Sequence, residues 1–131
     1  MKNLFLIALA VALLVGCGGS APKCSDSNVQ KTVLDISEQE MKNGMAMEMS
    51  NGRFNYEGMK SQSDSKPYRE RIDKLFPFKL TEIRTNKQDD KVRKCECAAN
   101  IVTAQGTSLP ITYHAQYTDK NEVYVEVFGL K

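Results

Sequence analysis

The pattern of apolar and polar residues changes character along this chain of 131 residues. Residues 4–15 form an uninterrupted apolar run, and residues 26–43 carry apolar side chains at helical spacing. From residue 78 onward, apolar and polar side chains alternate in short segments that turn-forming residues separate. A repeat of about 3.6 residues indicates a helix and a repeat of two indicates a strand, so we expect a helix followed by several strands.

The first periodic segment predicts an amphipathic helix from Asp26 to Asn43. The apolar residues of its stripe are Val29, Val33 and Ile36. Asp26 or Ser25 can cap the N-terminus of this helix, and Asn43 with Gly44 has the composition of a C-terminal stop. The apolar stripe has to be buried against another element.

A short second helix is predicted after a mixed segment, residues 45–66, whose last part (61–66) is expected to be a loop. Pro67 suits the first position of this helix, and Pro77 would end it. The residues predicted to share one face of the helix are Tyr68, Ile72 and Leu75.

Four strands are predicted next, over residues 78–86, 91–104, 109–118 and 122–129. Because the connections are short, neighbouring strands should be antiparallel and form a meander. In the last two strands, the side chains predicted to face the core are Ile111, Tyr113, Ala115, Tyr117, Val123, Val125 and Val127. The alternation indicates one covered face and one solvated face, and the helix from Asp26 to Asn43 is the predicted cover.

These elements predict an α+β fold, with an N-terminal helix packed on a four-stranded antiparallel meander sheet and a short second helix. The order of elements resembles that of cystatin-like and NTF2-like folds. Such folds host binders, inhibitors, scaffolds and enzymes, so this resemblance does not indicate an activity.

The apolar run at the start of the chain predicts export. Lys2 precedes it, and its twelve residues are fewer than the roughly 20 that a transmembrane helix needs. The run ends in Leu14-Val15-Gly16-Cys17, which resembles the lipobox of bacterial lipoproteins. The resemblance implies a diacylglycerol on the Cys17 sulfur, cleavage after Gly16 and acylation of the new amine.

The same resemblance predicts where the protein resides. Gly18 follows the predicted lipidation site, and in lipoproteins of this kind the lack of an aspartate there favours the periplasmic face of the outer membrane. The predicted organisation is a signal peptide (1–16), a lipidated tether (17–23) and one domain (24–131). Removal of the signal peptide leaves 17 basic and 16 acidic side chains, since Lys2 is lost. That balance argues against nucleic-acid binding.

The remaining three cysteines predict one disulfide in the oxidising periplasm, with one cysteine left over. Cys95 and Cys97 lie two residues apart and should face the same side of their strand. Cys97 is predicted to be the more deeply buried of the two, so the favoured pair is Cys24–Cys97, with Cys95 free or poorly buried. Cys24–Cys95 is the alternative.

The sequence contains residues for two possible metal sites, but neither site is predicted. A soft-metal site could use Cys95, Cys97 and His114, but the C-x-C spacing is not that of zinc ligands and the chain has one histidine. A copper(I) site would draw on a set of methionines, namely Met41, Met45, Met47, Met49 and Met59. Methionine is a common core residue, and a structural role is the simpler interpretation.

The sequence contains no recognisable catalytic motif, cofactor motif or phosphate-binding loop, so no enzymatic activity is predicted. The solvated sheet face is instead predicted to bind a partner protein, because aromatic and polar residues share it. Its residues are Thr112, His114, Gln116, Tyr124 and Phe128. The predicted function is an outer-membrane-anchored module that binds or assembles an envelope protein. The alternative is an inhibitor or immunity lipoprotein that neutralises a cell-wall hydrolase or toxin.

Overall fold

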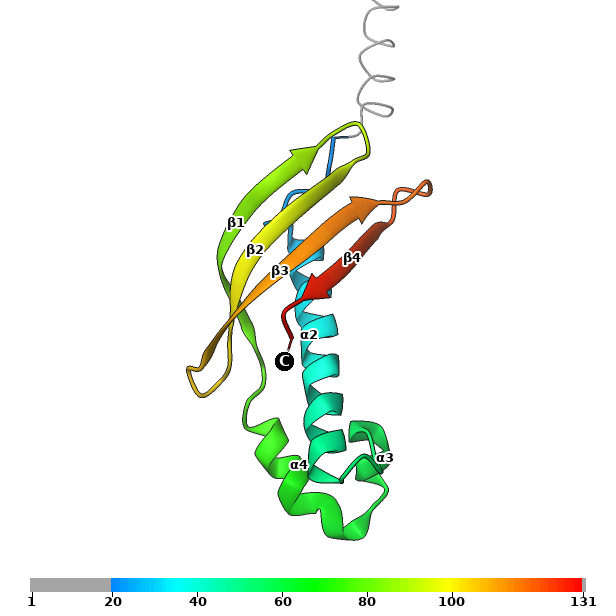
Figure 1. Ribbon diagram of the computed structural model, residues 1–131, viewed down its shortest axis with the longest axis vertical. Coiled ribbons are helices and arrows are strands. Elements are labelled where there is room, and N and C mark those ends of the chain that lie inside the picture. The colour runs from blue at the N-terminus through cyan, green and yellow to red at the C-terminus, as the bar shows by residue number, and fades with distance from the viewer. Residues whose placement is uncertain (1–19, 131) are drawn as a thin grey trace, which may run out of the picture.

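The computed structural model describes residues 20–130, in which one long helix, α2 (Ser27–Met49), packs on a four-stranded sheet (Figure 1). The predicted signal peptide and the lipidation site Cys17 lie outside the described residues. The strands are β1 (Lys79–Asp89), β2 (Lys94–Val102), β3 (Ser108–Tyr117) and β4 (Val123–Phe128). They run antiparallel in the order β1-β2-β3-β4, so the predicted α+β meander is confirmed. No helix in this part of the chain is long and apolar enough to cross a membrane.

The main core lies between α2 and the inner face of the sheet, as the alternation predicts. Val29 and Val33 of α2 are fully buried. The inward side chains of the two central strands are buried with them: Cys95, Cys97, Ala99, Ile101, Ile111, Tyr113 and Ala115. Burial alternates at every residue along β2, because successive side chains of a strand point to opposite faces.

The predicted end of the first helix at Asn43 and Gly44 is wrong. The helix continues to Met49, and the chain leaves it through Asn51 and Gly52, both with positive φ angles (54° and 81°). The Gly52 N–H donates to the Met47 carbonyl at 2.7 Å, which satisfies one of the free carbonyls at the helix end. The chain thus contains two Asn-Gly pairs, and the second one ends the helix.

A second core explains why the helix continues past Gly44. Three short helical segments follow α2: α3 (Tyr56–Lys60), a 3₁₀ turn (Ser63–Ser65) and α4 (Lys66–Asp73). They pack on the last turns of α2 and form a helical tip beyond the end of the sheet (Figure 1). The buried residues of this second core are Ala46, Tyr56, Met59 and Ile72. Apolar burial at Ala46 therefore stabilises helix where the local sequence favours a stop.

Other details of the helix predictions also differ from the structure. Asp26 occupies the N-cap position, but its carboxylate accepts a hydrogen bond from the Lys23 N–H (3.0 Å) and caps no N–H of α2. Pro67 lies in the first turn of α4 as predicted, and Ile72 is buried. Tyr68 is 46% exposed, so it does not share a buried face with Ile72. The helix ends at Asp73, before Pro77.

The start of the domain is tied to the sheet. Cys24 and Cys97 form a disulfide with a Cα–Cα distance of 5.8 Å, which is the predicted pairing. Cys95 is free, as predicted, but it is buried as completely as Cys97, so the predicted difference in burial between the two cysteines is wrong. Ala21 and Pro22, which were predicted to belong to the flexible tether, are also buried. The packed part of the domain therefore begins before Cys24.

Replacing Cys24 with alanine should lower the free energy of unfolding by about 4 kcal/mol, because it removes a link that spans 73 residues. Cys95→Ala is the matched control, since it removes a buried sulfur and no covalent link; its cost should be about 1 kcal/mol. Urea unfolding followed by circular dichroism measures both. Equal losses in the two variants would show that the disulfide contributes no constraint.

Candidate functional site

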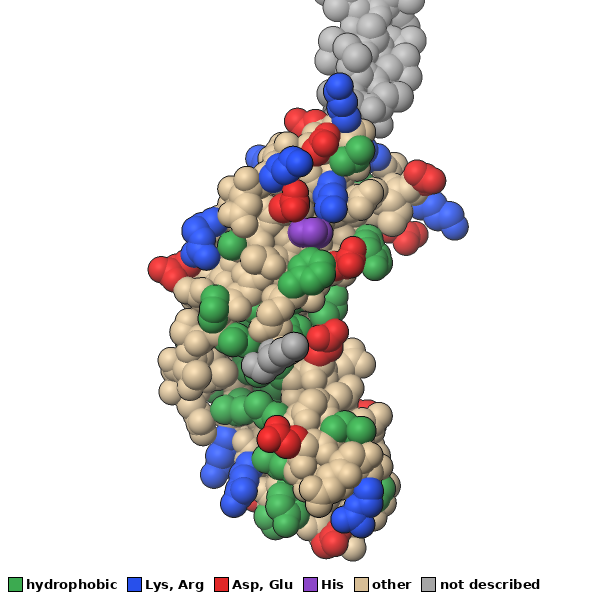
Figure 2. All heavy atoms as spheres, viewed as in Figure 1, with side chains coloured by type: hydrophobic (Ala, Val, Ile, Leu, Met, Phe, Trp, Pro, Cys, Tyr) green, Lys and Arg blue, Asp and Glu red, His purple; other side chains and the backbone are tan. Residues whose placement is uncertain are grey.

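All five residues predicted to bind a partner lie on the outer face of the sheet, the side turned away from α2. Figure 2 shows this face, with the histidine in purple. Two cross-strand pairs bring four of them together: Thr112 lies opposite Phe128, and Gln116 lies opposite Tyr124. Tyr124 is 55% exposed and Phe128 is 43% exposed. The predicted register is therefore confirmed. Binding by this face remains a prediction.

His114 occupies the centre of the outer face between two carboxylates. Glu96 of β2 and Glu126 of β4 are its cross-strand neighbours, and His114 Nε2 lies 3.3 Å from Glu96 Oε1. The imidazole also contacts the ring of Phe128 edge-on, with 5.0 Å between ring centroids. These contacts leave the His114 side chain 27% exposed, so it is half-buried rather than freely exposed. They hold the ring in place, and Phe128 is held with it.

The surroundings of His114 on the outer face are polar and aromatic. His114 neighbours glutamates, threonine and glutamine, and none of the described hydrogen bonds joins it to a serine, threonine or cysteine nucleophile. What the face offers is two exposed aromatic rings, several polar side chains and two glutamates beside His114. That composition is typical of a protein-contact patch.

The soft-metal site considered for Cys95, Cys97 and His114 is not present, because the three side chains do not lie together. Glu96, the cross-strand partner of His114, lies between the two cysteines in β2 and points to the opposite face. The cysteines are in the core and His114 is on the outer face. The five methionines do not share one environment. Met59 is buried in the second core, whereas Met47 and Met49 are exposed.

The three sulfur atoms of Cys24, Cys95 and Cys97 do form a buried cluster, all within 4.8 Å of one another. Two of them are bonded to each other, and Cys95 Sγ lies 3.4 Å from Cys97 Sγ. Burial raises the pKa of the Cys95 thiol, which keeps it protonated at neutral pH. A protonated, inaccessible thiol is a poor nucleophile and a poor metal ligand.

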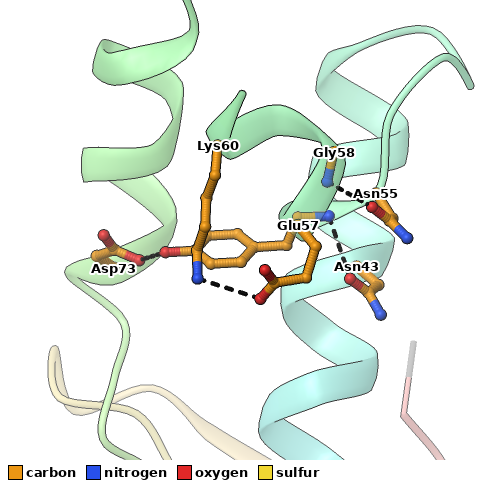
Figure 3. A network of polar contacts seen from close by, with 7 residues as sticks. Asn43, Asn55, Glu57, Gly58, Lys60 and Asp73 are labelled. Carbon is orange, nitrogen blue, oxygen red and sulfur yellow. Dashed lines mark hydrogen bonds and ion pairs between the residues drawn. The ribbon is translucent and has the colours of Figure 1, made fainter. Parts of the chain in front are cut away.

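A polar cluster that the sequence analysis did not predict lies at the helical tip (Figure 3). The side-chain oxygens of two asparagines hold α3 in place. Asn43 Oδ1 accepts from the Tyr56 N–H (3.1 Å), and Asn55 Oδ1 accepts from the Gly58 N–H (2.7 Å). A hollow of about 350 Å³ lies beside this cluster, between α2 and α3. Asn43, expected to stop the helix, instead connects α2 to α3.

The ring of Tyr56 is the centre of this cluster. The ammonium groups of Lys42 and Lys60 lie 5.3 and 5.2 Å from the ring centroid, and the phenol O–H donates to Asp73. Burial, followed by the hydrogen bond to Asp73, raises the pKa of Tyr56 to about 12. Tyr56 is therefore a neutral donor that joins α3 to α4. The cluster accounts for the packing of the tip without a ligand.

Tyr56→Phe should lower the free energy of unfolding by about 2 kcal/mol at pH 8, because Asp73 loses a donor at a partly buried site. In the wild-type protein this contribution is complete below pH 10 and is lost as the pH rises through about 12, since folding raises the pKa of Tyr56. Urea unfolding at several pH values tests both statements. Tyr68→Phe, at an exposed position of α4, is the control and should change stability by less than about 0.5 kcal/mol.

The chain was compared with known proteins by family, by sequence and by structure. No family model, no curated protein and no solved structure matched it.

Proposed function

We propose that this protein is a lipoprotein anchored to the periplasmic face of the outer membrane, where it binds an envelope protein through the outer face of its sheet. The observation that carries the proposal is the exposure of Tyr124 and Phe128 on that face. The inner face of the same sheet is already covered by α2, so these aromatic side chains are not needed for the core. Aromatic residues with a polar surround are enriched where proteins contact one another.

The ordered centre of the outer face also supports binding. His114 is held by Glu96 and by the ring of Phe128, so this part of the surface is fixed before a partner arrives. A fixed surface loses little side-chain entropy on association, which favours affinity. The neighbouring Thr112 and Gln116 supply hydrogen-bonding groups beside the aromatic rings.

The anchor in this proposal is the predicted lipid on Cys17. The Ala21 N–H donates to Asp90 Oδ1 (2.9 Å), and Asp90 directly follows β1. The chain therefore enters the domain at the β1–β2 turn, and the helical tip lies at the other end of the molecule (Figure 1). With two or three acyl chains at Cys17, membrane attachment would be stable, because each buried methylene contributes about 0.8 kcal/mol. The tip would then point away from the bilayer.

Replacing Cys17 with serine should remove the protein from the outer-membrane fraction, because serine cannot accept the thioether-linked lipid. The measurement is the distribution of a tagged protein between outer-membrane, inner-membrane and soluble fractions. The wild-type protein should be found in the outer-membrane fraction. The same distribution for both proteins would contradict the lipid anchor, and an inner-membrane distribution of the wild-type protein would contradict its location.

Replacing Tyr124 and Phe128 together with serine should abolish recovery of the partner after crosslinking in cells, while the melting temperature changes little because both side chains are exposed. Tyr68→Ser is the matched control, since Tyr68 is similarly exposed on the helical tip. Undiminished partner recovery in the double variant would contradict the proposal. Recovery of an added cell-wall hydrolase, and of no resident envelope protein, would identify the protein as an inhibitor instead.

A further inference from the structure

The edge of the sheet formed by β4 has unpaired backbone groups. In the described part of the chain, β4 forms ladder hydrogen bonds with β3 and with no other strand. The Thr118 N–H donates to the Glu122 carbonyl (2.8 Å), and the Glu122 N–H donates to Thr118 Oγ1 (3.2 Å), so the backbone groups of these two residues face each other just before the strand. Hydrogen-bonded and non-hydrogen-bonded pairs alternate in an antiparallel ladder. The N–H and C=O groups of Val123, Val125 and Val127 therefore point away from β3, toward the open edge.

The opposite edge of the sheet carries features that disfavour strand addition. β1 has two register shifts in its pairing with β2, between Thr81 and Arg84 and between Thr85 and Lys87. Glu82 lies at the first of these shifts, with a φ angle of 53°. Bulges and charged side chains, lysine above all, are the usual means by which edge strands avoid pairing with other chains. β4 has an unbroken register, no proline and no basic residue.

The charges along β4 indicate what kind of strand would fit. Residues 122–128 contain two glutamates and no lysine or arginine. Glu126 lies on the outer face, in line with His114 and Glu96 across the sheet. The exposed ring of Tyr124 on the same face can receive a guanidinium group. The inward side chains next to the edge are valines, of which Val123 and Val127 are only half-buried.

We propose that β4 accepts an extended, basic segment of the partner protein as an additional antiparallel strand. Arginine or lysine side chains of this segment would lie over the outer face beside Glu126 and Tyr124, and its alternate aliphatic side chains would cover Val123 and Val127. The outward N–H and C=O groups of the three valines would pair with its backbone. This inference rests on the proposed function and specifies how the partner is held.

A second copy of this chain does not fit the same edge. If two β4 strands paired antiparallel about Tyr124, Glu122 of each would lie directly opposite Glu126 of the other. If they paired about Val125, the two Glu126 side chains would be diagonal neighbours on one face. Like charges at such positions are destabilising, so the glutamates that attract a basic strand repel a copy of β4.

The test uses the full lipidated protein in detergent and a synthetic peptide in which arginine and valine alternate, matched to the six residues of β4. Hydrogen exchange followed by NMR reports the amides of Val123, Val125 and Val127. They should exchange fast in the free protein and at least about tenfold more slowly when the peptide is bound. Unchanged exchange at these three amides under saturating peptide would overturn the proposal.

Two methylated peptides separate strand pairing from general electrostatic attraction. In an antiparallel pair, the peptide valines lie opposite the β4 valines and direct their N–H groups at β4, while the arginine N–H groups point away. N-methylation of the valines should weaken binding by at least about tenfold, and N-methylation of the arginines should weaken it much less. Equal effects of the two methylations would contradict pairing along β4.

A charge-reversal variant tests the choice of partner. Glu126→Lys should weaken binding of the arginine peptide by about fivefold, while Glu70→Lys, a change at another exposed glutamate on α4, should have no effect. A glutamate peptide that binds as well as the arginine peptide, or a dimer of the free protein in sedimentation, would overturn the basic-strand assignment. If the peptide results hold while Tyr124→Ser with Phe128→Ser leaves partner recovery unchanged in cells, the proposed function fails and the edge assignment stands.

Discussion

The packing of one long helix against one face of a four-stranded sheet is the constraint on which the rest of this structure depends. Val29 and Val33 are fully buried against the inward side chains of the sheet, and the disulfide from Cys24 to Cys97 fixes the helix start to β2. Because a sheet needs cover on only one side, the outer face is left to solvent, and its side chains are free of any role in the core. The same helix extends beyond the sheet, so its last turns need a second set of partners. The three short helical segments supply them, with Ala46 at the centre of that second core.

The polar residues of the helical tip and those of the outer face therefore have different roles. At the helical tip, the Tyr56 hydroxyl and the two asparagine side chains bond to groups of the protein itself and thereby stabilise the tip. On the outer face, His114 contacts Glu96 and the ring of Phe128, while Tyr124 is 55% exposed and Phe128 is 43% exposed. The cluster at the helical tip is therefore structural, whereas the side chains of the outer face are accessible to a partner. The free edge of β4 borders that same surface, so side-chain contacts and backbone pairing could act on one ligand.

The sequence predicts the sheet well because strand alternation is a local signal with a repeat of two. The inward positions of β3 and the register of the outer face follow from it. It also places Cys95 and Cys97 on one face, but it does not distinguish the pair Cys24–Cys97 from the alternative Cys24–Cys95. The helix boundaries were predicted less well, because they depend on contacts distant in sequence. Asn43 and Gly44 have the composition of a helix stop, yet burial of Ala46 against Tyr56, Met59 and Ile72 continues the helix. The burial of Cys95 and the polar cluster around Tyr56 were missed for the same reason, since both depend on residues brought together only by the fold.

The central claim is that the outer face of the sheet holds a protein partner, and the most direct measurement is site-specific photo-crosslinking in intact cells. A photoreactive amino acid would replace Tyr124 on the outer face or, in parallel, Tyr68 on the helical tip; the two side chains are similarly exposed. The account predicts that Tyr124 yields a crosslink to one envelope protein and that Tyr68 yields none to that protein. A partner crosslinked from Tyr68 and not from Tyr124 would contradict the account and would assign binding to the helical tip.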